Sequence, residues 1–137
     1  MNKDKLILEV EEKEILKFLI SIGTPNLYRA KLWLLCSGAK RDINENPDYY
    51  ANLILLSSNV PSLYEKQINL DVVRSNPKKN KNQVYLEQLR RILTCYSIRN
   101  SSIGYCQGFN FIVCRLLDVL KDEVKIIFIL LEKYYIL

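Results

Sequence analysis

Apolar residues recur along this chain at intervals of three and four, the spacing that places side chains on one face of an α-helix. The clearest stretch carries Tyr85, Leu89, Ile92, Leu93 and Tyr96 at positions i, i+4, i+7, i+8 and i+11, which form a single helical stripe. No segment alternates between apolar and polar residues cleanly enough to predict a strand. The pattern therefore predicts an all-α fold.

Other helices are marked by glycine and proline residues, which commonly begin or end helices. The first spans about residues 3–21 and places Ile15, Leu16, Leu19 and Ile20 on one face. Further helices are expected at about residues 29–36, in a segment with Pro47 in its first turn, and in a segment after Pro61. Two more are expected at about residues 107–120 and from Asp122 onward.

Two breaks in the helical pattern predict loops. The first is the proline–lysine run at residues 77–81, which we expect to be a solvated surface loop. The second is rich in Asn, Ser and Gly and lies at residues 100–104. Arg90 and Arg91 lie on the helix between the loops, and we expect them to line its outer face.

The last expected helix, at residues 124–137, is apolar on nearly every side. A helix of this kind is normally buried inside a larger body. We therefore expect residues 1–137 to form a single helical domain whose last helix packs between neighbours or lacks a partner. The second case would make the chain a fragment of a longer domain.

Composition is that of one soluble globular domain, with 137 residues, 49% hydrophobic and 26% charged. The formal net charge of +5 permits an acidic partner without naming it. Nucleic acid, an anionic membrane and an acidic protein surface all remain open on charge alone.

The absence of histidine removes several classes of chemistry. Ser-His-Asp and Cys-His catalysis are excluded as usually built, and so are zinc sites that contain histidine. Cys36, Cys95, Cys106 and Cys114 show no C-x-x-C spacing, which predicts reduced thiols in a cytosolic protein and no metal site. The polar first residues predict no signal peptide, and no stretch is long and uncharged enough to span a bilayer.

Two short segments carry candidate chemistry. Asp71 and Arg74 are three residues apart and so share a helical face, where the acid can orient the guanidinium. The alternative is a routine surface ion pair, which contributes little. Gln107 lies between Gly104 and Gly108 at the edge of an expected helix, where it can present its amide or simply close a turn.

Together the two segments resemble the paired signature of TBC domains, the Rab GTPase-activating proteins. The I-x-x-D-x-x-R motif falls on residues 68–74, and the Y-x-Q-G motif falls on residues 105–108. Residues 22–33 resemble the family's early G-x-P, arginine and tryptophan element, and residues 100–110 resemble its longer glutamine segment. Residues 37–50 are similar to the growth-hormone-regulated TBC subgroup. The resemblance covers the chain from about residue 19 to its C-terminus.

The resemblance implies an all-α TBC-type bundle that activates a Rab-type GTPase in trans and is not itself an enzyme. Arg74 would be the arginine finger, and Gln107 the glutamine finger that positions the attacking water. GTP and magnesium would belong to the partner, so no cofactor of its own is expected. The implied location is the cytoplasm, with endomembranes reached only through the partner.

Other residues of the motifs are expected to have supporting roles. Asp71 would orient Arg74, and Tyr105 would pack beneath the glutamine loop. Gly104 and Gly108 would let the backbone approach the partner closely because they lack a Cβ atom. The expected scaffold residues are Asn110, Arg29 and Trp33.

Departures from the family pattern leave other functions open. Ser75 replaces a usual threonine, Phe109 replaces a common methionine, and the chain is shorter than the family's whole domain, so it is expected to be its N-terminal helical part. One alternative is a truncated module that binds a GTPase or scaffold without catalysis. A basic nucleic-acid binder ranks third because no recognisable reading motif is present, and we expect no nucleic-acid partner.

Overall fold

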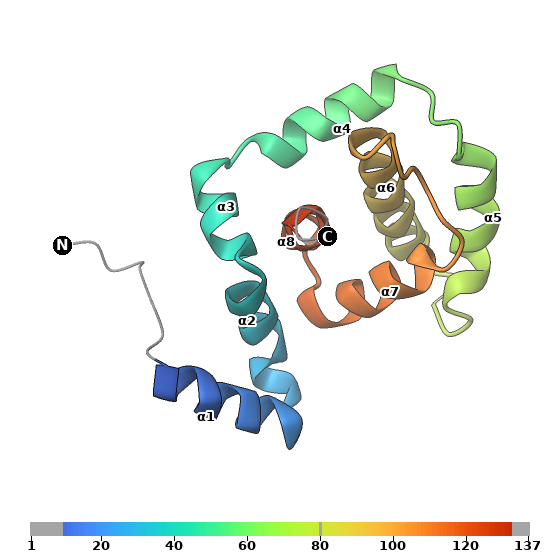
Figure 1. The fold of residues 1–137 in the computed structure, drawn as a ribbon. Coiled ribbons are helices and arrows are strands. Elements are labelled where there is room, and N and C mark those ends of the chain that lie inside the picture. Colours follow the sequence, from blue (N-terminus) through green and yellow to red (C-terminus); the bar gives the residue numbers. More distant parts are fainter. Residues whose placement is uncertain (1–9, 80, 133–137) are drawn as a thin grey trace.

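The computed structural model describes residues 10–79 and 81–132, and its regular structure in those ranges is entirely helical (Figure 1). The all-α prediction is therefore confirmed. The helices are α1 (Val10–Ser21), α2 (Asn26–Ser37), α3 (Ala39–Glu45), α4 (Tyr49–Asn59), α5 (Glu65–Ser75), α6 (Gln83–Arg99), α7 (Phe109–Leu120) and α8 (Glu123–Glu132).

The helices from α2 to α7 form a ring around α8, which is seen end-on at the centre of Figure 1. Helix α8 packs against α2, α3, α6 and α7. Helix α6 contacts α4, α5, α7 and α8, and so connects the central helix to the ring. Helix α1 lies outside the ring beyond α2 (Figure 1).

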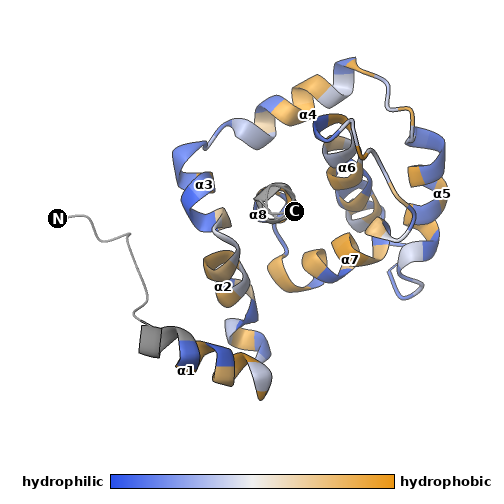
Figure 2. Cartoon of the chain, in the orientation of Figure 1, coloured by the Kyte–Doolittle hydropathy of each residue, from blue (hydrophilic) through white to orange (hydrophobic). Residues whose placement is uncertain are grey.

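Burial follows the predicted stripe of α6. Tyr85, Leu89, Ile92, Leu93 and Tyr96 are all buried, so the prediction for this helix is confirmed. Helix α7 is largely hydrophobic (Figure 2), and its Val113, Leu117 and Leu120 are buried. Leucine, isoleucine and valine on opposed helices thereby form one continuous core, and burial of this kind is the main stabilising contribution to such a fold.

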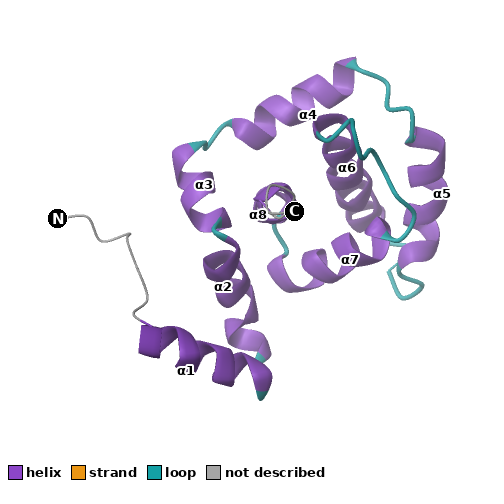
Figure 3. Ribbon diagram, in the orientation of Figure 1, coloured by secondary structure: helices purple, strands orange, loops and turns teal. Residues whose placement is uncertain are grey.

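Helix boundaries differ from the sequence prediction at several points (Figure 3). Helix α3 was not predicted; it begins directly after Gly38, whose φ of 79° ends α2 in a left-handed turn. Helix α7 begins at Phe109 rather than at Gln107, because Gly108 adopts a φ of 106° that no helix allows. Pro47 lies in the turn before α4 and not in its first helical turn.

The first and last predicted helices are described only in part. Residues 3–9 and 133–137 of those predictions lie outside the described residues. In α1, Ile15 and Leu19 are 59% and 50% exposed, so the apolar face predicted for this helix is turned largely to solvent. In α8, Ile126 and Ile127 are fully buried, which fits the prediction that this helix packs between neighbours.

The partly buried carboxylate of Glu123 joins three of these helices. Arg91 on α6 donates from Nε to Glu123 Oε2 at 2.8 Å and from Nη2 to Oε1 at 2.6 Å. Tyr50 on α4 donates to the same Oε2 at 2.5 Å. The prediction that Arg91 lines the outer face of α6 is therefore wrong. Arg90 likewise donates to Asn69 on α5 at 2.6 Å.

The pKa of Glu123 lies below its ordinary value despite partial burial. Burial alone would raise this pKa, but the hydrogen bonds from Arg91 and Tyr50 favour the charged carboxylate and outweigh it. A carboxyl whose pKa is depressed in the folded state stabilises the fold above its unfolded pKa of about 4.3. That stabilisation is lost as pH falls through the folded pKa.

Replacing Glu123 with Gln should lower the free energy of unfolding at neutral pH by about 1–3 kcal/mol, because Arg91 loses its charged partner. It should also flatten the fall in stability below about pH 4.3, since the titrating group is gone. Urea unfolding between pH 3 and pH 7 measures both effects. Glu45→Gln, at an exposed position on α3, is the matched control. An unchanged pH profile for Glu123→Gln would contradict this assignment.

Candidate functional site

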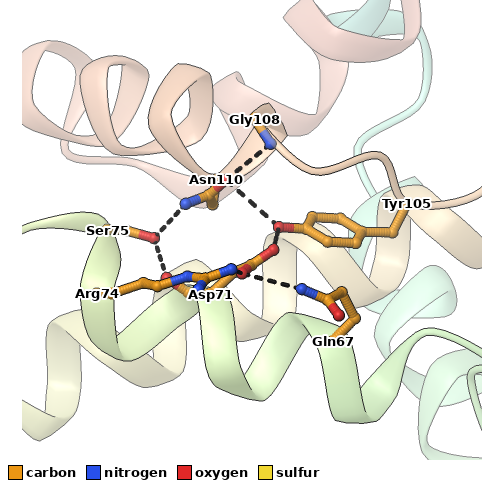
Figure 4. Close-up of polar contacts among 7 residues, drawn as sticks. All are labelled: Gln67, Asp71, Arg74, Ser75, Tyr105, Gly108 and Asn110. Carbon is orange, nitrogen blue, oxygen red and sulfur yellow. Dashed lines mark hydrogen bonds and ion pairs between the residues drawn. The ribbon is translucent and has the colours of Figure 1, made fainter.

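The candidate site is organised by the carboxylate of Asp71, which is fully buried at 0% exposure. Three side chains donate to it (Figure 4). Tyr105 Oη donates to Oδ2 at 2.6 Å, and Gln67 Nε2 donates to Oδ1 at 3.1 Å. Arg74 Nη2 forms an ion pair with the same Oδ1. A buried charge is tolerated only when it is paired and hydrogen-bonded in this way.

The helical spacing of α5 explains why Asp71 is inside and Arg74 is outside. Ile68 and Val72 are fully buried and fix one face of α5 against the core, and Asp71 lies between them on that face. Arg74 lies one turn further on, at the edge of the buried face. Its side chain is 57% exposed even while it pairs with Asp71, so the arginine remains accessible from solvent.

The pKa of Asp71 lies below its ordinary value. Burial acts in the opposite direction, but hydrogen bonds from Tyr105, Gln67 and Arg74 and the positive charge of Arg74 outweigh it. The pKa of Tyr105 is raised, first by burial and then by its hydrogen bond to the Asp71 carboxylate. At neutral pH the site therefore contains a charged carboxylate and a neutral phenol.

Gln107 lies in the turn between Tyr105 and α7, and its side chain is exposed. Tyr105, two residues earlier, is buried and anchored on Asp71. One residue after Gln107, the Gly108 amide donates to Asn110 Oδ1 at 3.1 Å. The exposed glutamine thus lies between two residues that are held by hydrogen bonds, Tyr105 and Gly108.

A second connection joins α5 to α7. Asn110 is buried and donates from Nδ2 to Ser75 Oγ at 2.8 Å, and Ser75 in turn donates to the Asp71 carbonyl at 2.5 Å. Tyr105 Oη also lies 3.4 Å from Asn110 Oδ1 (Figure 4). Asp71, Ser75, Tyr105 and Asn110 thus form one closed set of hydrogen bonds, here called the Asp71 network. It fixes the helix that bears Arg74 relative to the loop that bears Gln107.

The two glycines of the loop have different surroundings. Gly104 is buried at a φ of 67°, and a Cβ atom added there would lie 2.1 Å from Tyr64 Oη. Its close approach is therefore to the chain's own Tyr64, and the interpretation that it approaches a partner is wrong. Gly108 has open space where a Cβ would be, which leaves its predicted approach to a partner available.

The remaining predicted residues lie elsewhere. Arg29 and Trp33 are on α2, across the ring from α5 (Figure 1). Arg29 Nη2 donates to the Thr24 carbonyl at 3.0 Å, and Trp33 packs partly buried against the core. Their scaffold role stays a prediction that these contacts suit.

The proline–lysine loop is less solvated than predicted. Lys79 forms an ion pair with Asp118 on α7 and lies 4.7 Å from the centroid of the Tyr85 ring. Lys78 and Lys81 are exposed, as expected. Lys79 thus fastens the loop that follows α5 to α6 and α7.

Two members of the site were missed by sequence reasoning. Gln67 lies four residues before Asp71, a spacing that predicts contact on a helix, but an isolated glutamine gives no further signal. Ser75 was noted only as a substitute for threonine, and its bond to Asn110 spans 35 positions of the chain. Long-range pairings of this kind cannot be read from spacing.

Within residues 10–79 and 81–132, no three His, Cys, Asp or Glu side chains gather as a metal site would require. No described helix has both the length and the apolar character needed to cross a bilayer. The four cysteines are free thiols; Cys95 and Cys114 are buried, whereas Cys36 and Cys106 are exposed.

Comparisons with known proteins agree on one domain family. The family model for the Rab-GTPase-TBC domain matches residues 26–136. Growth hormone-regulated TBC protein 1 of Xenopus laevis is 34% identical over 121 residues, covering 85% of this chain and 35% of that protein. Growth hormone-regulated TBC protein 1-A of Danio rerio is 38% identical over 106 residues, covering 74% and 29%. The chain therefore spans about a third of the length of these relatives.

A solved structure extends the comparison to the fold. The crystal structure of the Chlamydomonas flagellar RabGAP TBC domain matches with a TM-score of 0.77 and 27% sequence identity. The match covers 95% of this chain and 45% of that one. The resemblance seen in the motifs is thereby confirmed for both sequence and fold.

Replacing Tyr105 with Phe should lower the free energy of unfolding by about 1–3 kcal/mol, because Oδ2 of the buried Asp71 carboxylate loses its donor. Urea unfolding at pH 7 measures this effect. Tyr28→Phe, at an exposed position on α2, should change stability by less than about 0.5 kcal/mol. Equal effects of the two substitutions would show that the Tyr105 hydroxyl contributes nothing to the Asp71 network.

Replacing Gly104 with Ala should destabilise the chain mainly through its clash with Tyr64. The added Cβ forces the ring to move, and the expected loss is about 1–3 kcal/mol. In a Tyr64→Ala background the same glycine substitution should cost much less, and a double-mutant cycle measures the difference. Additive losses in the cycle would mean that backbone strain alone, without the Tyr64 contact, explains the effect.

Proposed function

The chain belongs to the Rab-GTPase-TBC domain family, and on that premise we propose that it activates a Rab-type small GTPase, supplying Arg74 and Gln107 in trans to accelerate GTP hydrolysis. GTP and magnesium would be held by the GTPase, and this chain would contribute side chains only. We propose that this activity serves membrane trafficking, at a cytoplasmic membrane surface that the chain reaches through its partner.

The observation that carries the proposal is an exposed arginine held by a buried carboxylate that also anchors the glutamine loop. Hydrolysis of GTP develops negative charge on the transferred phosphoryl oxygens, and a guanidinium compensates it with permanent charge and several donors. Because Asp71 is buried and Arg74 is 57% exposed, the arginine is oriented by a group in the interior and is accessible to a partner from solvent. The ion pair with Asp71 keeps the guanidinium at this surface before a partner docks.

The glutamine has the complementary task. A carboxamide both donates and accepts hydrogen bonds. Its N–H can therefore donate to one lone pair of a water molecule and leave the water's other lone pair aimed at phosphorus. Gln107 is exposed in a turn whose neighbours are fastened to α5 and α7 by the Asp71 network. The network therefore connects the helix that bears Arg74 to the loop that bears Gln107.

The surface around these residues suits a protein partner. Leu70 and Val73 on α5 are 65% and 51% exposed beside Arg74, and Phe111 and Ile112 are exposed at the start of α7 after Gln107. We propose that the GTPase covers these apolar side chains when it docks, because they adjoin both fingers. Their burial would also exclude water from around Arg74 and strengthen its interaction with phosphate.

Binding without activation is the second candidate. The match covers 45% of the solved RabGAP TBC domain, and the exposed apolar side chains beside Arg74 and after Gln107 lie within the matched part. A module of this kind would engage the GTPase through the same apolar side chains while leaving hydrolysis at its intrinsic rate.

Replacing Arg74 with Ala should reduce stimulated hydrolysis by about 10³-fold or to the intrinsic rate, as expected for an arginine finger. Replacing Gln107 with Ala should reduce it by about 10²-fold or more, the usual effect of losing one preorganised polar group. Phosphate release from a panel of GTP-loaded Rab-type GTPases, with and without the chain, measures the rates. Lys66→Ala, which removes an exposed cation from the same helix, should leave them unchanged.

Three results decide between the candidates. Stimulation that disappears in both finger variants while GTPase binding persists supports activation in trans. Binding by the wild-type chain with no stimulation of any GTPase supports the second candidate. Stimulation that survives Arg74→Ala would overturn the assignment of the arginine.

A further inference from the structure

The Oδ1 atom of Asp71 has two donors from its own helix. Arg74 Nη2 reaches it from three residues later, and Gln67 Nε2 reaches it from four residues earlier at 3.1 Å. Oδ2 is occupied separately by Tyr105. Figure 4 shows Gln67 and Arg74 approaching the carboxylate from opposite ends of α5.

The shared oxygen matters because Asp71 is fully buried. Removing the donor from a buried carboxylate oxygen costs a free energy comparable to that of a hydrogen bond to a charged group. In this structure the guanidinium folds back along α5 and is held by Asp71. Extension of Arg74 away from its helix toward a nucleotide in another protein would release this contact.

We propose that Gln67 is a positioning residue that keeps Asp71 Oδ1 hydrogen-bonded while Arg74 extends toward the nucleotide of the partner GTPase. This inference rests on the proposed function. Gln67 is an exposed residue of α5, and it donates to Oδ1 from the opposite end of the helix to Arg74. It therefore remains on Oδ1 in both arrangements of the arginine. The tyrosine keeps Oδ2 satisfied throughout.

Without Gln67, Arg74 would be the sole donor to Oδ1. Extension of the Arg74 side chain would then leave Oδ1 without a hydrogen-bond donor, and the extended arrangement would be populated less often. A lower population of the reactive arrangement reduces the rate of the chemical step, whereas docking through the apolar side chains of α5 and α7 is unaffected. The expected signature is a fall in kcat with little change in KM.

The first test needs no GTPase. Gln67→Leu and Arg74→Met should each raise the unfolding equilibrium constant only slightly, because the other residue still donates to Oδ1. The double variant should raise it by about 3- to 30-fold more than the product of the single effects. Urea unfolding of the whole chain at pH 7 provides the four constants. Lys66→Leu, at the adjacent exposed position, replaces Gln67→Leu in a control cycle that should be additive. Additive effects of Gln67→Leu and Arg74→Met would overturn the proposal.

The second test measures stimulated hydrolysis with a responsive GTPase. Gln67→Leu should lower kcat by about 3- to 30-fold at nearly constant KM, and Lys66→Leu should change neither. An unchanged kcat for Gln67→Leu, or a loss confined to KM, would overturn the proposal. If the wild-type chain stimulates no GTPase, the proposed function fails, and the non-additive cycle alone then decides whether Gln67 and Arg74 share the carboxylate oxygen.

Discussion

The buried carboxylate of Asp71 is the constraint on which this site depends. A negative charge with no exposure to solvent requires donors, and its donors come from α5 itself and from a loop that lies 34 positions further along the chain. Satisfying the charge therefore brings together two segments that sequence alone keeps apart. Arg74 is oriented, Tyr105 is anchored and the loop bearing Gln107 is held, all through one functional group.

A second carboxylate solves a similar problem elsewhere in the fold. Glu123 binds Arg91 of α6 and Tyr50 of α4, and it joins the central helix to two helices of the ring. In both places an acid, a tyrosine and an arginine combine across elements. The difference lies in exposure, because Arg91 is turned inward by its two bonds to Glu123, whereas Arg74 keeps one contact and remains accessible. One arrangement stabilises packing and the other leaves a cation available.

The sequence predicted those features that depend on helical periodicity. The stripe of α6 is buried as expected, and the relation of Asp71 to Arg74 follows from helical spacing. The pattern did not predict α3, because seven residues after a left-handed glycine carry too few apolar positions to define a face. The contacts of Tyr105, Asn110 and Ser75 depend on how distant helices pack. Gly104 had to be reinterpreted for the same reason, since its neighbour Tyr64 lies 40 positions earlier in the chain.

The Asp71 network lies beneath the surface that it organises. Asp71, Tyr105 and Asn110 are buried, whereas Leu70, Val73 and Phe111 are exposed around the proposed fingers. Outer side chains can therefore be exchanged during evolution without disturbing the geometry underneath. Such a division would let related chains diverge in which partner they recognise while they inherit the same chemistry unchanged.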